Sequence, residues 1–260
     1  MIEEWNKRRI YSLTTDIEYL DLRDHQHEDH HQLVYMIKGT SHVLFEKSEY
    51  FLPEGFIGLI PSGQMHNIRS RNEMVKMFLL YFPANISLSK FLSFSANDFM
   101  IENIRFISKK GAALDSNSDK TVFDFVSSFL RLLLNMATEN QFPLKGLIAP
   151  KNERLRSVLN YLRTNYSENI TLSKVASELG FTVRNLTRLF KKENISFNNY
   201  LNYIRIIHAI ELFSEHRDNI SGVAFEVGYN SASNFGRTFK KYTGKTPGEF
   251  IRNNSTKSIE

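Results

Sequence analysis

The stretch that decides the fold of this chain is ISGVAFEVGYNSASNFGRTFKKYTGKTPGEFIR, residues 220–252. Apolar residues stand at i, i+3, i+4 and i+7 in its first part, from Ile220 to Val227, and this spacing predicts one apolar face of a short helix. Gly228 follows, and glycine often ends a helix because it adopts positive φ without strain. The stretch therefore begins with a predicted short helix and a turn.

A second helix is predicted from Ala232, and its two sides differ. Ala232, Phe235 and Phe239 fall on one side, which we expect to be buried. The opposite side is polar and cationic, and it carries Ser233, Asn234, Arg237, Lys240 and Lys241. A helix-turn-helix presents a recognition helix of this kind to the major groove of DNA. The alternative is an ordinary helix pair with a solvated basic face.

The same pattern occurs a second time, upstream. Residues 172–181 repeat the apolar and glycine positions of residues 220–229 at a distance of 48 residues. The segment RLFKK at 188–192 lies 49 residues before RTFKK at 237–241, so the second turn is predicted to be one residue longer. We expect the first unit to have helices over 171–180 and 183–193. An internal repeat of this kind favours a duplicated helix-turn-helix over a chance match.

The composition describes a soluble globular protein with room for two domains. The chain has 260 residues, of which 42% are hydrophobic and 23% charged. No apolar run approaches the ~18 residues of a membrane span, and the N-terminus does not resemble a signal peptide. The sequence contains no cysteine, which excludes disulfides, a thiolate nucleophile and cysteine-ligated zinc. These features lead us to expect a cytoplasmic protein that does not interact with membranes.

Positive charge is concentrated in the half that holds the repeat. Residues 151–260 contain 17 Lys and Arg against 10 Asp and Glu, a net charge of +7, whereas residues 1–150 have a net charge of −2. Such an asymmetry is typical of a nucleic-acid-binding module joined to a neutral or acidic domain.

The first half of the chain predicts a small β-barrel or jelly roll with covering helices. Short segments rich in β-branched and aromatic residues are separated by glycine and proline, which predicts strands over 17–22, 32–37, 40–46, 49–52, 56–60 and 74–82. From residue 87 the period changes to that of helices, predicted over 87–95, 98–108 and 119–140. The proline- and glycine-containing segment 141–152 is the expected linker.

The helix predicted over residues 119–140 carries a broad apolar stripe. One interpretation is that it is shared with a second subunit, which makes a homodimer through this helix an expected assembly. The other is that it covers only its own barrel. Leu132 and Leu133 are the positions where a charge would distinguish the two interpretations.

The outward faces of the repeated units contain the residue types that read DNA. Arginine forms bidentate hydrogen bonds with guanine, and asparagine does so with adenine. Because side chains near the start of a recognition helix usually reach the bases, the base-reading candidates are Arg184, Asn185, Arg188, Ser231, Ser233, Asn234 and Arg237. Later positions more often reach phosphate, so the phosphate candidates are Lys191, Lys192, Lys240 and Lys241. Any one of these residues could instead be merely solvated.

A long helix is predicted between the two units, over residues 197–216. About 20 residues at ~1.5 Å each would span ~30 Å, close to the ~34 Å repeat of B-DNA. One chain could therefore place two recognition helices in successive major grooves.

Residues 153–252 resemble the DNA-binding domain of the AraC/XylS family of bacterial transcription regulators. The resemblance is carried mainly by GYNSASNFGRTFKKYTGKTPGEF, residues 228–250. The first unit departs from the family at Ile195, where glycine is frequent. The resemblance implies double-stranded promoter DNA as partner, activation through contacts with RNA polymerase, and an N-terminal domain that binds a small-molecule effector and dimerises.

Residues 25–39 and 55–66 resemble the two cupin motifs. His25, His27, Gln32 and Gly39 occupy the positions of the first motif, and the second is matched by Gly55, Pro61, Gly63 and His66. Gln32 stands where cupins have a glutamate. The effector-pocket candidates are therefore His25, His27, Gln32 and His66. No metal is assigned, although three histidines could hold a divalent ion; the alternative is a hydrogen-bonded polar cluster, with His30 and His31 partly exposed.

Two enzyme functions are alternatives to that of a regulator. A cupin dioxygenase or isomerase with an appended DNA-binding tail lacks support, because Gln32 replaces the ligand carboxylate and no other acid/base constellation is visible. A DNA-repair protein that transfers an alkyl group needs a nucleophilic cysteine, which this chain does not have. We therefore expect that this chain is not an enzyme and has no cofactor.

These observations predict an α+β chain in four parts. Residues 1–140 form a cupin-like effector-binding and dimerisation domain, and 141–152 a linker. Residues 153–252 form an all-α DNA-binding domain of two helix-turn-helix units joined by a long helix, and 253–260 a tail. The expected function is that of a sequence-specific, effector-responsive transcriptional activator.

Overall fold

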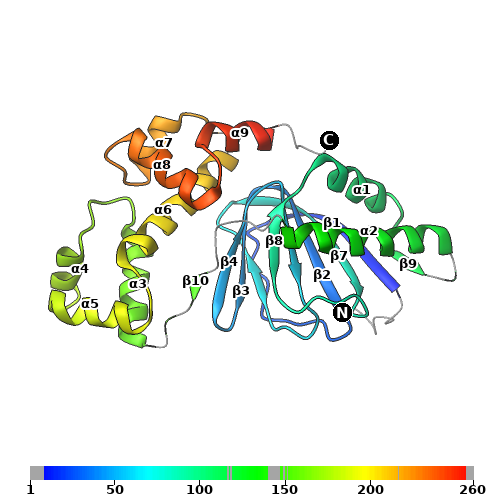
Figure 1. The fold of residues 1–260 in the computed structure, drawn as a ribbon, viewed down its shortest axis with the longest axis horizontal. Coiled ribbons are helices and arrows are strands. Elements are labelled where there is room, and N and C mark those ends of the chain that lie inside the picture. Colours follow the sequence, from blue (N-terminus) through cyan, green and yellow to red (C-terminus); the bar gives the residue numbers. More distant parts are fainter. Residues whose placement is uncertain are drawn as a thin grey trace. The chain divides into compact units, whose positions relative to one another are not determined.

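The computed structural model of the protein describes residues 9–115, 117, 119–139, 147–148, 150, 152–215 and 217–255. The chain forms two compact units (Figure 1). The first contains the described residues up to 139, apart from Lys47–Glu49; the second contains Lys47–Glu49 and the described residues from 147 to 253. Most of the predicted linker, residues 141–152, and most of the tail, 253–260, lie outside the described residues. Domain boundaries at these segments stay a prediction.

The first unit is built from antiparallel strands in two sheets. The six-stranded sheet has the order β8-β5-β2-β7-β1-β9, formed by Leu92–Ser95, Phe56–Ile60, His30–Lys38, Met74–Pro83, Arg9–Glu18 and Ala113–Asp115. The smaller sheet has the order β4-β3-β6, formed by Ser48–Leu52, Ser41–Phe45 and Asn67–Arg69. Strand β10, Leu147–Ile148, belongs to the second unit and pairs with Ser48 and Glu49 of that unit. The β-rich prediction is confirmed, but the two sheets do not close into a barrel.

Strand β2 is the centre of the larger sheet and is buried along almost its whole length. It pairs with β5 on one side and β7 on the other, which places Gln32 opposite both Ile60 and Tyr81. A strand covered on both faces reads as a continuous buried run. The expectation that His30 and His31 are partly exposed was therefore wrong, since both belong to this strand and are 2% and 3% exposed.

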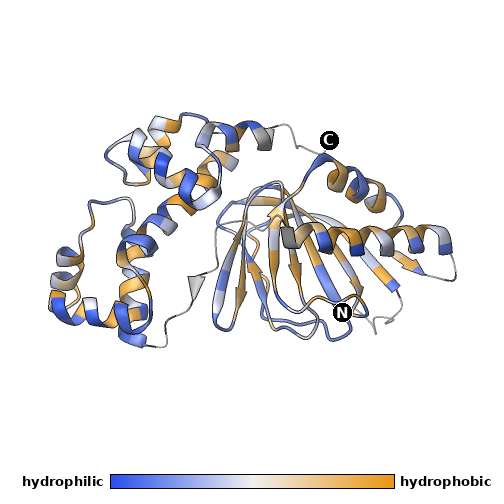
Figure 2. Ribbon diagram, viewed as in Figure 1, coloured by the Kyte–Doolittle hydropathy of each residue, from blue (hydrophilic) through white to orange (hydrophobic). Residues whose placement is uncertain are grey.

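Helices α1 (Asp98–Ser108) and α2 (Lys120–Glu139) pack on the larger sheet and complete the core of the first unit. Figure 2 shows the hydrophobic residues concentrated along the strands and on one side of each helix. Leu133 lies in this core and is 1% exposed, whereas Leu132 is 47% exposed. A charge at Leu133 would therefore disrupt the core of the protomer, and only Leu132 is placed to test association.

The helix predicted over residues 87–95 is not present, because the second half of this segment is strand β8. Leu92 and Phe94 are buried while Ser93 and Ser95 are half-buried, which is the alternation of a strand. The segment is too short for the periods of helix and strand to be separated from sequence with certainty. Residues 113–115, for which no strand or helix was predicted, pair with β1 as strand β9.

The second unit is helical, as predicted. Its helices are α3 (Glu153–Asn165), α4 (Leu172–Glu178), α5 (Val183–Lys192), α6 (Phe197–Ser214), α7 (Ile220–Glu226), α8 (Ala232–Thr243) and α9 (Pro247–Ser255). The first turn spans 179–182 and the second 227–231, so the second is longer by one residue, as expected. Helix α6 has 18 residues and spans about 27 Å, shorter than predicted. Residue 216 lies outside the described residues.

Each helix of the two helix-turn-helix units begins with a capping side chain. Thr171, Thr182, Asn219 and Ser231 each accept a hydrogen bond from a backbone N–H three residues further on. Such caps satisfy N–H groups that have no partner within the helix, and each contributes about 1 kcal/mol. The starts of the recognition helices are therefore defined by local sequence.

Arg205, in the middle of α6, connects the two helix-turn-helix units. Its guanidinium donates to the backbone oxygens of Tyr166 and Glu168, both at 2.8 Å, and lies over the ring of Tyr229 at 5.5 Å. Tyr229 follows Gly228 in the second turn. At Gly228, which has φ +91°, a Cβ atom would lie 2.8 Å from the oxygen of Ser167 and 2.9 Å from that of Tyr166. The second turn thus packs directly on the backbone that follows α3.

We expect Gly228→Ala to destabilise the helical unit more than Gly180→Ala. The two glycines occupy equivalent places in the repeat and both have positive φ, which costs alanine ~1–2 kcal/mol. A Cβ atom at Gly180 meets nothing within 4 Å, whereas one at Gly228 collides with backbone. Urea denaturation followed by helical circular dichroism measures the difference. The control is Gly236→Ala, in open space within α8, which should be neutral or stabilising. Equal losses for Gly180→Ala and Gly228→Ala would contradict this account of the contact.

Candidate functional site

Helix α5 presents a cationic outer face and an apolar inner one. Leu186 and Phe190 are buried beneath it, and Leu189 is half-buried. Of the predicted DNA-binding residues on this helix, Asn185 is half-buried and the others are exposed: Arg184, Arg188, Lys191 and Lys192. The Asn185 Oδ1 atom accepts a hydrogen bond of 3.3 Å from Arg188 Nη2, which orients the arginine along the helix.

Helix α8 has the same plan. Phe235 and Phe239 are fully buried, and the predicted DNA-binding residues are all exposed: Ser231, Ser233, Asn234, Arg237, Lys240 and Lys241. The Ser231 oxygen accepts the backbone N–H of Asn234 at 3.1 Å, so this side chain caps the helix, which leaves its O–H donor and one lone pair. The hydroxyl of Tyr242 donates to the backbone oxygen of Asn199 at 2.9 Å and anchors α8 on α6.

The cations on these faces form no close ion pairs with described residues. In the part of the chain that the structure describes, none of the seven arginines and lysines proposed for DNA binding forms an ion pair. Other cations of the second unit do form them: Lys174 with Glu168 at 2.8 Å and Arg217 with Glu226 at 2.6 Å. The outer faces of α5 and α8 are thus left available to an anionic partner.

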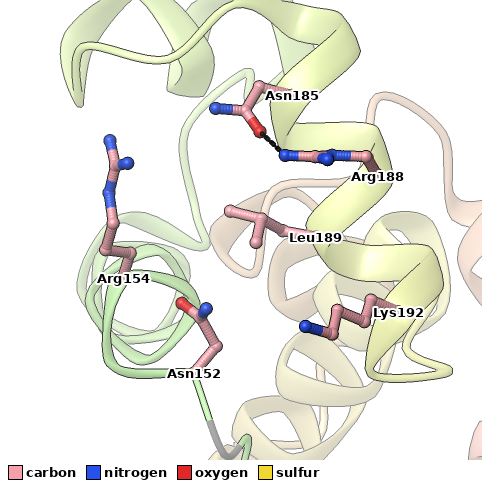
Figure 3. A pocket seen from close by; sticks show the side chains of 6 residues that line it. All are labelled: Asn152, Arg154, Asn185, Arg188, Leu189 and Lys192. Atoms are coloured by element: carbon pink, nitrogen blue, oxygen red, sulfur yellow. Dashed lines mark hydrogen bonds between the residues drawn. The ribbon is translucent and has the colours of Figure 1, made fainter.

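Sequence reasoning missed residues that join the α5 face. A hollow of about 310 Å³ lies between the start of α3 and α5 (Figure 3). Its lining combines residues of α5 with two from the start of α3: Asn152, Arg154, Asn185, Arg188, Leu189 and Lys192. Arg154 lies outside the repeated pattern, and only the packing of α3 against α5 brings it to this face.

Three of the four effector-pocket candidates from the cupin motifs meet in the first unit as a histidine cluster. Ring nitrogens of His25, His27 and His66 all lie within 4.8 Å of one another. The Nδ1 atoms of His25 and His66 are each 2.8 Å from a backbone oxygen, of Arg23 and Gln64 respectively. These contacts suit Nδ1–H donors, which leaves each Nε2 atom with a lone pair.

Gln32, the fourth candidate, bridges the cluster to Tyr81. Its side-chain amide lies 2.9 Å from His66 Nε2 and 3.4 Å from the Tyr81 hydroxyl. A neutral imidazole has one N–H, so His66 cannot donate to both Gln64 and Gln32. His66, Gln32 and Tyr81 are satisfied together when the Gln32 amide is turned so that its NH₂ donates to His66 Nε2 and its oxygen accepts from Tyr81. The amide can therefore take the place that a metal would have on this ring.

Two histidines of the cluster, His27 and His66, are uncharged at neutral pH. Burial, followed by the neighbouring histidines His25, His66 and His30, lowers the pKa of His27 to about 4. Burial also lowers the pKa of His66 to about 4. Neutral rings are able to accept hydrogen bonds from a ligand or to coordinate a cation.

A divalent metal fits the donor set but is not required by it. Three imidazoles are a known zinc ligand set, and the backbone-bonded Nδ1 atoms of His25 and His66 match the usual orientation of metal-binding histidines. Bonds of ~2.0–2.1 Å need nitrogens roughly 3.4 Å apart, so the rings would have to rotate inward. Gln32 contributes no negative charge to such a site.

His66 also lies beside an aromatic cluster. The ring of Phe45 is 6.4 Å from His66, 5.7 Å from Tyr50 and 5.5 Å from Phe91, measured between centroids. Polar groups next to an aromatic surface are typical of sites for small organic molecules.

We expect saturating Zn²⁺, Ni²⁺ or Mn²⁺ to leave the melting temperature unchanged, because Gln32 already occupies His66 Nε2 and adds no negative charge. An ion at 100 times its dissociation constant would add ~2.7 kcal/mol and raise the melting temperature by several degrees. Calorimetry with and without ion makes the measurement, and His27→Ala is the matched control. A rise in the wild type that His27→Ala abolishes would establish a metal site.

Two family models match the chain, one in each unit. A model described as an AraC-like ligand binding domain matches residues 16–97, and one described as a helix-turn-helix domain matches residues 175–253. Together they cover more than half of the chain. No helix of the described residues is long and apolar enough to cross a membrane.

Curated relatives are named as transcriptional regulators. The chain is 30% identical over 142 residues to the lactose operon transcription activator of Staphylococcus xylosus, which covers 54% of this chain and 50% of that one. It is 28% identical over 100 residues to an uncharacterized helix-turn-helix regulator of Staphylococcus aureus, covering 38% of this chain and 13% of that one. The chain thus spans half or less of the length of these relatives.

Among solved structures, ToxT from Vibrio cholerae with a bound unsaturated fatty acid is similar at 15% identity and a TM-score of 0.40, covering 95% of this chain and 96% of that one.

A ligand-binding domain and a helix-turn-helix domain in one chain define the class of this protein. Within that class, the chain belongs to the AraC/XylS family of transcriptional regulators.

Proposed function

We propose that this chain is an effector-responsive transcriptional regulator that binds promoter DNA in a sequence-specific way. The observation that carries the proposal is the repeat of α5 and α8, each with a buried aromatic or aliphatic inner face and an outer face of unpaired cations. An uncompensated basic face on a recognition helix suits the phosphates and base edges of the major groove.

Within each recognition helix, position decides the proposed role. The base-reading residues are those in the first part of each helix and at its cap: Arg184, Asn185, Arg188, Ser231, Ser233, Asn234 and Arg237. The residues that contact phosphate are those of the last turns: Lys191, Lys192, Lys240 and Lys241. Because α5 offers two arginines and α8 one, with Ser231 occupied as a cap, α5 contributes more to base discrimination.

The two helix-turn-helix units act on one continuous DNA site. Helix α6 spans about 27 Å between them, somewhat less than the ~34 Å helical repeat of B-DNA. Arg205 and the close approach at Gly228 hold the second helix-turn-helix unit against the first. A change in the spacing between the DNA segments bound by α5 and α8 should therefore weaken binding sharply.

The first unit supplies regulation. A small-molecule effector binds at His25, His27, Gln32 and His66, beside the aromatic rings of Phe45, Tyr50 and Phe91. The relative named a lactose operon transcription activator supports activation, for which contact with RNA polymerase is the proposed route. Because the relatives are named as regulators, an enzymatic activity is not part of the proposal.

A second copy of the chain is the proposed occupant of the exposed apolar face of α1 and α2. Phe99, Phe106, Phe125 and Leu132 lie on these helices and are 40–49% exposed. The Phe106 and Phe125 rings contact each other edge to face at 5.4 Å, which makes one surface of the two helices. Large exposed apolar groups that adjoin each other mark association surfaces, and self-association buries both copies at once.

Arg188→Ala and Arg237→Ala should each weaken binding and relax base preference in a different segment of the site. Loss of a bidentate arginine–guanine contact costs ~1–3 kcal/mol and is specific to one position. In vitro selection of duplexes with the wild type and each variant gives the two preferences. The control is Lys241→Ala, which should weaken binding to all sequences alike. A uniform loss for both arginine variants would refute their role in reading bases.

Leu132→Glu should convert a dimer into a monomer without unfolding the protomer, because the side chain is half exposed. Sedimentation gives the mass, and the melting temperature reports the fold. Arg131→Ala, which lowers the net charge equally at an exposed neighbouring position of α2, is the control and should stay dimeric. A monomeric wild type, or a dimer unaffected by Leu132→Glu, would rule out this interface.

A further inference from the structure

The hollow beside α5 gathers three cations from two helices. Figure 3 shows Arg154 extending from α3, with Arg188 and Lys192 extending from α5 on the opposite side and Leu189 between them. The amides of Asn152 and Asn185 complete the lining. All these residues belong to the helical unit.

Arg154 is held in place by the first helix-turn-helix turn. Its guanidinium carbon lies 4.5 Å from the centre of the Phe181 ring, and Phe181 follows Gly180 in that turn. A guanidinium over an aromatic face keeps the N–H groups at its edge available for hydrogen bonds. The arginine is thus oriented without use of its donors.

The three positive charges lack an anion among the described residues. No carboxylate forms an ion pair with Arg154, Arg188 or Lys192, and Asn185 contributes only a neutral oxygen, at 3.3 Å, to Arg188. Cations that converge on one hollow repel one another, and an anion placed between them removes that cost. Arginine and lysine together are the usual ligands of phosphate groups.

We propose that this hollow binds a backbone phosphate of the DNA whose bases α5 reads, with Arg154 as a phosphate anchor contributed from outside the helix-turn-helix. Arg154 and Lys192 bind the phosphate from its two sides. Arg188, oriented by Asn185, lies on the side of the bases. The inference rests on the proposed function and fixes the register of α5 on the duplex, because a phosphate contact positions a helix without reading sequence.

The first test is the salt dependence of affinity for a duplex selected with the wild-type chain. Each neutralised phosphate contributes ~0.9 to the slope of log affinity against log salt. Arg154→Ala should lower the slope by about one, weaken binding ~10-fold and leave the base preference unchanged. Arg154→Lys should retain the slope. The control is Arg156→Ala, which removes the same charge from an exposed position two residues along α3 and should leave the slope unchanged.

The second test replaces single phosphates of that duplex by neutral methylphosphonates. The wild type should lose affinity at one phosphate beside the α5 segment, and Arg154→Ala should lose less at that position, because only Lys192 still contacts it. If Arg154→Ala and Arg156→Ala behave alike while the wild type binds the duplex, the inference is overturned and the proposed function stands. A wild type that selects no duplex overturns the proposed function itself.

Inorganic phosphate, added without DNA, distinguishes a backbone phosphate from a free one. Millimolar phosphate should leave the melting temperature of the wild type and of Arg154→Ala equally unaffected. A stabilisation that requires Arg154, with a slope for DNA that does not, would assign the hollow to a free phosphate compound and overturn the assignment to DNA.

Discussion

The contact between the second turn and the backbone after α3 is the constraint on which the helical unit depends. Gly228 has no side chain, so the carbonyl oxygens of Tyr166 and Ser167 lie where a Cβ atom would be too close to them. Arg205 satisfies the oxygens of Tyr166 and Glu168 and covers the Tyr229 ring. Two helix-turn-helix units on a single connecting helix could otherwise take many orientations. This contact selects one, and two recognition helices act on one site only when their spacing is fixed.

The binding faces depend on charges that the protein leaves without partners. Elsewhere in the second unit, cations are paired with carboxylates, as Lys174 is with Glu168. Among the described residues the cations of α5 and α8 form no ion pairs, and the interior aromatic residues Phe190, Phe235 and Phe239 hold the helices in place. Stability and recognition are thus assigned to opposite faces of the same helices. The hollow at Arg154 extends the cationic face onto a third helix.

The ligand-binding unit shows how one residue changes a motif. Gln32 lies on a strand that is paired on both sides, which fixes the direction of its side chain. The side chain contacts His66 and Tyr81. A carboxylate there would favour a cation, whereas the amide satisfies a neutral ring by a hydrogen bond. Burial keeps His27 and His66 neutral by lowering their pKa to about 4. The site is therefore suited to a neutral or polar organic ligand, with the rings of Phe45 and Phe91 beside it.

Local sequence by itself determined the repeated helices, their caps and the polarity of their faces, because helix period and capping depend on residues three or four positions apart. It also predicted the strand-rich first half, and it placed three histidines in two motifs that the fold brings together. Tertiary structure alone decided three matters. It made residues 92–95 a strand, since four residues are too few to distinguish the periodicity of a strand from that of a helix. It buried His30, His31 and Leu133, since burial depends on what pairs or packs from elsewhere. It also brought Arg154 to the same hollow as Lys192, since only the packing of α3 on α5 joins positions so distant in sequence.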